Sequence, residues 1–104
     1  MHNIWIADDD EAIRLVLEES LSSAGFKTKS FNSADDLLQN LDKEQPDLII
    51  TDVQMPGMLG YDLLKHINNN YENIPVIVMT AFADMQAAVE SFGGGAFEYI
   101  PKPF

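Results

Sequence analysis

The chain contains no cysteine among its 104 residues. Disulfide bonds, zinc–thiolate sites and thiol catalysis are therefore excluded, and the absence fits a reducing compartment. No apolar run approaches the roughly 20 residues that a membrane span requires. Residues 1–5 also lack the pattern of a signal peptide. We therefore expect a soluble, cytoplasmic protein without a membrane partner.

Basic residues are also scarce: six Lys and Arg face seventeen Asp and Glu, which gives a net charge of −11. Direct binding to nucleic acid needs clustered Lys and Arg, so we expect none. The acidic excess suits a cation-binding surface or a basic partner, although a solvated acidic surface accounts for most of the acids. Apolar residues make up 46% of the chain, enough for a packed core, and the length predicts one domain.

Short apolar segments alternate with helical patterns along the whole chain. The expected strands are 4–7, 27–31, 48–52, 76–80 and 96–100, and the expected helices cover about 10–24, 33–41, 60–68 and 84–92. Such an alternation predicts a parallel sheet with helices on both faces. The fold class is therefore α/β, and we expect a flavodoxin-like, doubly wound sheet of five strands in the order 2-1-3-4-5.

The first helix has recognisable ends. Asp10 is a plausible N-cap and Gly25 is the expected residue just beyond the C-terminus. Apolar residues recur at helical spacing and predict one buried stripe. The expected stripe consists of Ile13, Val16, Leu17, Leu21 and Ala24. The same spacing predicts that the second helix buries Leu37, Leu38 and Leu41, and that the third buries Leu63, Leu64 and Ile67.

Carboxylates follow two of the apolar strands. Asp8 and Asp9 come directly after the first strand, and Asp52 ends the third, before Met55-Pro56-Gly57. In the order 2-1-3-4-5 these strands are neighbours, so the three carboxylates should converge at one sheet edge. Carboxylates packed together repel one another unless a cation joins them, and oxygen ligands without His or Cys suit Mg²⁺. Taken alone, such acids are more often helix caps and turn residues.

Two further polar side chains end the fourth and fifth strands. The Thr80 hydroxyl can donate to a phosphoryl oxygen, and the ammonium of Lys102 can pair with phosphoryl charge. Each has an ordinary alternative, as a strand-end threonine and a surface lysine. Together with the acids they describe a site for phosphoryl transfer to a carboxylate.

The order and spacing of these motifs resemble those of a two-component response-regulator receiver domain, over essentially the whole chain. The motifs are Asp8-Asp9, Asp52 with Met55-Pro56-Gly57, Thr80-Ala81, Tyr99 and Lys102-Pro103. Residues 95–104 are most similar to receivers of nitrogen-regulatory-type transcriptional activators.

The resemblance implies roles for the residues of the acidic edge. Asp52 would accept a phosphoryl group from a sensor histidine kinase. Asp9, Asp52 and the carbonyl of Gln54 would hold Mg²⁺ directly, and Asp8 would act through water. Asp10 aligns with a position that is not a ligand.

The resemblance also implies a switch and a domain arrangement. Thr80 and Lys102 would engage the phosphoryl group, and Tyr99 would turn inward as Thr80 moves. Receivers normally continue into a fifth helix, whereas this chain stops at Phe104. We therefore expect residues 1–104 to be a receiver truncated before that helix, without its output domain. Apolar side chains of strands three to five should then be exposed and favour a dimer or a less stable monomer.

Three other interpretations remain. A degenerate receiver would be an interaction module that takes no phosphate, but the full set of site residues argues against it. A phosphatase with an aspartyl-phosphate intermediate, like the haloacid dehalogenase family, would have a second Asp where Gln54 stands. A flavin-binding protein would have a phosphate-binding loop after the first strand, where acids lie instead.

Overall fold

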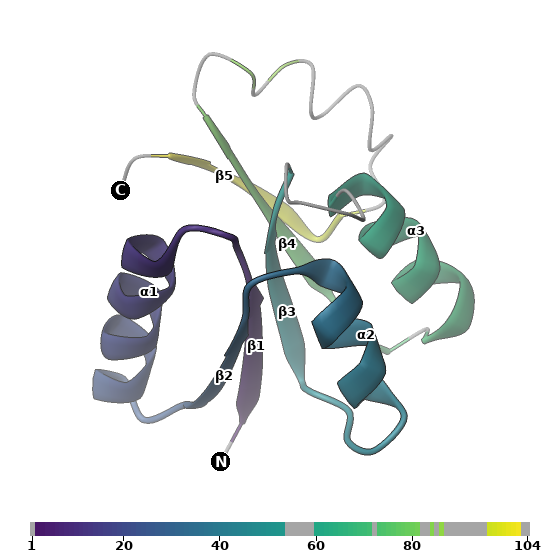
Figure 1. The fold of residues 1–104 in the computed structure, drawn as a ribbon, viewed down its shortest axis with the longest axis horizontal. Coiled ribbons are helices and arrows are strands. Elements are labelled where there is room, and N and C mark those ends of the chain that lie inside the picture. Colours follow the sequence, from purple (N-terminus) through teal and green to yellow (C-terminus); the bar gives the residue numbers. More distant parts are fainter. Residues whose placement is uncertain are drawn as a thin grey trace.

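The computed structural model of the chain describes residues 2–53, 60–71, 73–81, 84, 86 and 96–102. Five strands form one parallel sheet in the order β2-β1-β3-β4-β5, which confirms the predicted topology (Figure 1). The strands are β1 Asn3–Ala7, β2 Lys27–Phe31, β3 Leu48–Asp52, β4 Val76–Ala81 and β5 Glu98–Lys102. The helices with assigned bounds are α1 Glu11–Ser23, α2 Ala34–Leu41 and α3 Gly60–Asn70. None of these helices is long and apolar enough to cross a membrane.

Helices cover both faces of the sheet, with α2 and α3 on one side and α1 on the other (Figure 1). The larger core lies under α2 and α3. It joins buried side chains of the sheet to Leu37 and Leu41 of α2 and to Leu63, Leu64 and Ile67 of α3. The expected inward residues of these two helices are therefore confirmed, and their burial fixes how both helices lie on the sheet.

The smaller core lies under α1. Ile13, Leu17 and Leu21 pack against a buried cluster that includes Ile50 and Met79. The predicted stripe is wrong at Val16, whose exposed fraction is 47%, and also at Ala24, which is exposed. The inward residues recur every four positions, and a neighbour such as Val16 is rotated by about 100° around the helix axis.

The two edge strands differ from the central ones in composition. β2 is polar and lies at one edge, as expected. β5 lies at the other edge and is shifted by two residues from its predicted place, so that it contains Pro101. A proline lacks a backbone donor, but β5 pairs with β4 alone, and an edge strand tolerates this loss.

The predicted end of α3 is also wrong. The helix was expected to end at about residue 68, yet it continues to Asn70. The side-chain amide of Asn70 donates a hydrogen bond to the carbonyl oxygen of His66 at 2.9 Å. The backbone nitrogen of Tyr71 also donates to the carbonyl oxygen of Ile67 at 2.7 Å, so the helical hydrogen-bond pattern continues past Asn70.

The apolar side chains expected to be exposed on the α1 face are mostly covered. Ile50 and Met79 are buried, with exposed fractions of 6% and 0%, because they pack in the cluster under α1. Leu48, Ile77 and Ile100 are half-buried. The expectation of an exposed patch is therefore wrong for the middle of the sheet. The helix predicted over 84–92 lies largely outside the described residues.

Candidate functional site

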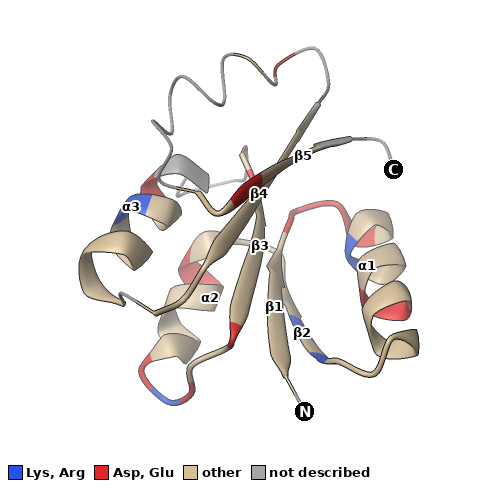
Figure 2. Ribbon diagram, turned by 180° about the vertical axis from the view of Figure 1, so that it is seen from behind, with Lys and Arg blue, Asp and Glu red and all other residues tan. Residues whose placement is uncertain are grey.

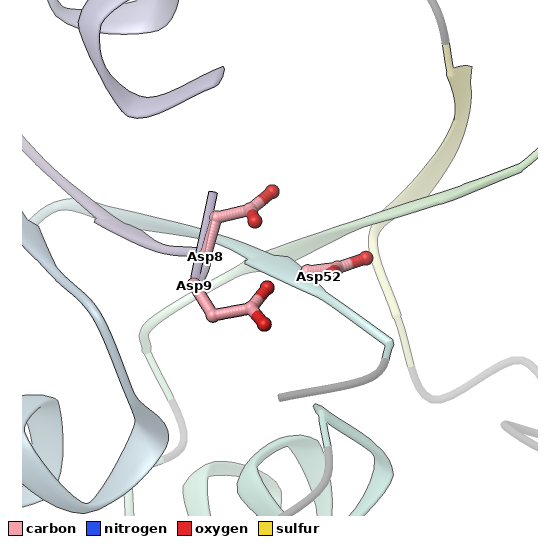
Figure 3. A group of neighbouring side chains, drawn as sticks. All are labelled: Asp8, Asp9 and Asp52. Carbon is pink, nitrogen blue, oxygen red and sulfur yellow. The ribbon is translucent and has the colours of Figure 1, made fainter. Parts of the chain in front are cut away.

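The pairing of neighbouring strands brings three acids to one edge of the sheet. Ala7 pairs with Thr51, so Asp8 and Asp52 follow at the same level of adjacent strands. Asp9 is the next residue of the β1–α1 turn. The three carboxylates each offer an oxygen, and these oxygens lie within 4.8 Å of one another (Figure 3). The predicted convergence of the acids is therefore present in the structure.

The environments of the three acids differ. Asp8 is fully buried, Asp52 is half-buried and Asp9 is exposed. Figure 2 shows the acidic β1–α1 turn at the end of the sheet, where α1 begins. A buried carboxylate beside two others is costly unless a cation or donors compensate its charge. The arrangement is therefore suited to a cation that reaches the acids from the exposed side of Asp9.

Main-chain donors hold two of the carboxylates in place. Oδ1 of Asp8 accepts from the backbone nitrogen of Asp10 at 2.9 Å, and Oδ1 of Asp52 accepts from the nitrogen of Val53 at 2.8 Å. The Thr51 hydroxyl donates to the carbonyl oxygen of Asp52 at 3.0 Å. The carboxylates of Asp8 and Asp52 are thus fixed by the backbone at each strand end.

Asp10 is a helix cap, as predicted. Its Oδ1 accepts from the backbone nitrogens of Ala12 at 2.9 Å and Ile13 at 3.4 Å, at the N-terminus of α1. It does not belong to the group of acids that could share one ion. Gly25 has a φ of 96° just beyond α1, which agrees with its predicted place after the helix.

The sequence interpretation missed Arg14. Its Nη1 donates to the carbonyl oxygen of Asp8 at 2.6 Å, from the first turns of α1. The available signal was a single basic residue, six positions after the first acid, in a chain with few basic residues. Nothing in that spacing indicates a contact with a main-chain carbonyl.

The donor set of this edge fits Mg²⁺. Hard cations prefer oxygen ligands, and Mg²⁺ usually binds one or two carboxylates and keeps several waters. Asp8, Asp9 and Asp52 supply only oxygens, from one buried and two accessible side chains. Gln54, the expected fourth contributor, lies outside the described residues.

Strand β4 brings Thr80 to the same end of the sheet. Asp52 pairs with Met79, so Thr80 lies one residue beyond that level on the next strand, and it is 3% exposed. Tyr99 pairs with Val78, and alternation along β4 puts Thr80 on that same sheet face. The ring of Tyr99 is half-buried against the larger core.

Lys102 is placed by its backbone alone. It is the last residue of β5 and pairs with Ala81, next to Thr80 on β4. Its backbone therefore reaches the edge at which the acids lie. Its side chain lies outside the part of the structure that is described.

The parallel order of the sheet and the acids at its carboxyl edge agree with the receiver class of signalling domains. A family model described as the response regulator receiver domain matches residues 4–104. The chain belongs to this family. The predicted resemblance is therefore confirmed.

The relatives include transcriptional regulators. The chain is 47% identical to the DNA-binding transcriptional regulator NtrC of Proteus hauseri over 102 residues, which are 98% of this chain and 22% of that protein. It is 36% identical to the regulatory protein AtoC of Escherichia coli K12 over 104 residues, which are 100% of this chain and 23% of that protein. The chain thus spans about a fifth of the length of these relatives.

Solved receiver structures share the fold. The response regulator TrrA of Thermotoga maritima, crystallised in complex with Mg²⁺–BeF, has a TM-score of 0.88 and 28% identity, and the match covers 100% of this chain and 89% of that one. Full-length FixJ of B. japonicum has a TM-score of 0.88 and 36% identity, with coverage of 99% and 51%.

Proposed function

We propose that the chain is a phosphorylation-dependent switch in which Asp52 accepts a phosphoryl group from a sensor histidine kinase. The observation that carries this proposal is the convergence of Asp8, Asp9 and Asp52 at one sheet edge, with ligand oxygens within 4.8 Å. Asp52 is the half-buried member and ends a strand, so its carboxylate is held in place yet accessible. A positioned carboxylate is the nucleophile that an aspartyl phosphate requires.

In the transfer step, a carboxylate oxygen of Asp52 attacks the phosphorus of the kinase's phosphohistidine. The new P–O bond forms as the P–N bond breaks. The electron pair of the P–N bond returns to the imidazole nitrogen, which then binds a proton. Dephosphorylation is the attack of water on phosphorus, which releases inorganic phosphate and restores the carboxylate. We expect the chain to promote both steps on itself, without acting as an enzyme on other substrates.

We propose Mg²⁺ as the cofactor. Asp9, Asp52 and the carbonyl of Gln54 would hold it directly, and Asp8 through water. Once bound, Mg²⁺ would offset the charge of the carboxylates and of the transferred phosphoryl oxygens. The Thr80 hydroxyl and the Lys102 ammonium would hold the phosphoryl group from the neighbouring strands.

Thr80 and Tyr99 are the proposed switch. Phosphorylation can shift a conformational equilibrium only through contacts that differ between the two states. The Thr80 hydroxyl would make such a contact with the phosphoryl group. Tyr99 shares its sheet face and lies on the adjacent edge strand, so a movement of Thr80 would change the packing of the ring.

The chain would be the receiver of a longer cytoplasmic regulator. We propose that a fifth helix follows Phe104 and that an output domain receives the signal. The half-buried Leu48, Ile77 and Ile100 support a further covering element on the α1 face. Without that helix, a second copy of the chain could cover the same side chains by forming a dimer through this face. We expect no direct contact of this domain with nucleic acid.

The test is incubation of the chain with acetyl phosphate and Mg²⁺, followed by intact-mass measurement. We expect one phosphoryl group per chain, no label with Asp52→Asn, and no label after chelation. Asp35→Asn is the matched control, because it removes one exposed carboxylate of α2 at the same change of charge. Absence of label on the parent chain would favour a degenerate receiver. Release of many phosphates from a phosphoester would favour a phosphatase.

A further inference from the structure

Arg14 links α1 to the main chain of the acidic turn. Its Nη1 donates to the carbonyl oxygen of Asp8 at 2.6 Å in a partly buried setting. A hydrogen bond from a charged donor is shorter and stronger than one between neutral groups. The contact therefore ties a residue of the first helix to the residue that begins the candidate cation site.

This bond closes a ring of contacts around the β1–α1 turn. The Asp8 carboxylate accepts from the backbone nitrogen of Asp10, and the Asp10 carboxylate caps α1 at Ala12. The guanidinium of Arg14, which lies in α1, in turn donates to the carbonyl oxygen of Asp8. The turn is thus held at Asp8 and at Asp10, and Asp9 lies between these two residues.

We propose that Arg14 is a positioning residue that sets the affinity and selectivity of the site for a divalent cation. By holding the carbonyl of Asp8, it fixes the turn from which the carboxylates of Asp8 and Asp9 face Asp52. The inference rests on the proposed function, because it assumes that these acids hold Mg²⁺. Arg14 itself is not a ligand, since a guanidinium has no acceptor.

Charge and geometry predict opposite effects on the affinity for Mg²⁺ when Arg14 is replaced by a neutral residue. Removal of a positive charge next to an acidic site strengthens cation binding by Coulomb's law. Loss of the hydrogen bond from Arg14 to the Asp8 carbonyl weakens cation binding, because the acidic turn is then held less firmly. Mg²⁺ demands near-ideal octahedral geometry, whereas Ca²⁺ accepts flexible arrangements. A looser turn should therefore reduce the affinity for Mg²⁺ more than that for Ca²⁺.

The experiment measures Mg²⁺ and Ca²⁺ binding by calorimetry for the parent chain, Arg14→Gln and Arg14→Met. Gln keeps a polar side chain, and Met keeps the apolar stem of the arginine, so one variant serves if the other fails to fold. Lys43→Gln is the matched control, because it removes one exposed positive charge from the turn after α2. Circular dichroism and thermal melting establish that each variant is folded.

We expect Arg14→Gln to weaken Mg²⁺ binding by about tenfold, at the low end of the cost of losing a residue outside the ligand shell, because Arg14 acts through the backbone of Asp8. Ca²⁺ binding should weaken less, and Lys43→Gln should bind both ions as the parent does. A folded Arg14→Gln or Arg14→Met chain with equal or tighter Mg²⁺ binding would overturn the inference alone. A parent chain that binds no Mg²⁺ would instead overturn the proposed function.

Discussion

Ala7 lies opposite Thr51 in the parallel pairing of β1 with β3, and an aspartate follows each of them. Asp8 and Asp52 therefore leave the sheet at the same level, on adjacent strands. The site is thus a consequence of register: a shift of either strand by one residue would move its aspartate to the other face of the sheet.

Neutralising Asp9 should stabilise the chain in the absence of metal. Asp9→Asn removes the exposed member of three neighbouring carboxylates, so their repulsion falls. In chelator, we expect the free energy of unfolding in urea to rise by up to about 1 kcal/mol. The parent should gain stability from Mg²⁺, because a ligand that binds only the folded state stabilises it. An equal gain for the variant would show that Asp9 is not a ligand.

Loss of the Thr80 hydroxyl should separate phosphorylation from its structural consequences. Thr80→Ala should still accept a phosphoryl group at Asp52, since the nucleophile and the acids remain. The change of NMR chemical shifts around Tyr99 on phosphorylation should be smaller than in the parent. Thr28→Ala, on the opposite edge strand β2, is the control and should respond as the parent does. Undiminished shifts in Thr80→Ala would exclude the proposed relay.

The cap of α1 can be tested against the cap of α2. Asp10→Ala and Ser33→Ala each remove a side-chain acceptor from a helix N-terminus and should each cost about 1 kcal/mol of unfolding free energy. Only Asp10 adjoins the acidic turn, so only Asp10→Ala should also weaken Mg²⁺ binding. The measurements are urea unfolding and calorimetry. A similar loss of Mg²⁺ affinity in Ser33→Ala would mean that the effect is global.

A chain extended by one further helix should be more stable than residues 1–104. The reason is that Leu48, Ile77 and Ile100 would become covered. Sedimentation and thermal melting compare the two chains. We expect the shorter one either to form a dimer or to melt at a lower temperature and bind a hydrophobic dye. If both chains are monomeric and equally stable, the proposal of a covering fifth helix is wrong.

The sequence predicted the sheet because its central strands are apolar on both faces. A run such as 48–51 can be buried only between two layers, and short connections leave few topologies. The core positions of α2 and α3 followed from helical spacing. The buried stripe of α1 was predicted too wide, because the sequence does not distinguish an apolar residue beside the stripe, such as Val16, from one within it.

The ends of elements were predicted less well than their existence. The fifth strand was expected to end at residue 100, yet β5 continues through Pro101, since an edge strand can lose one donor. At the site, the acids were predictable from strand ends and register. Arg14 was not, because its partner is a main-chain carbonyl, and a backbone acceptor leaves no mark in the sequence.

The most direct test is to locate the phosphoryl group after labelling with acetyl phosphate and Mg²⁺. Borohydride reduces an aspartyl phosphate to homoserine, and tandem mass spectrometry of the digested chain then identifies the position. We predict homoserine at Asp52 alone. Reduction at Asp8 or Asp9, or a labelled chain with no reduced residue, would contradict the assignment of Asp52 as the phosphoacceptor.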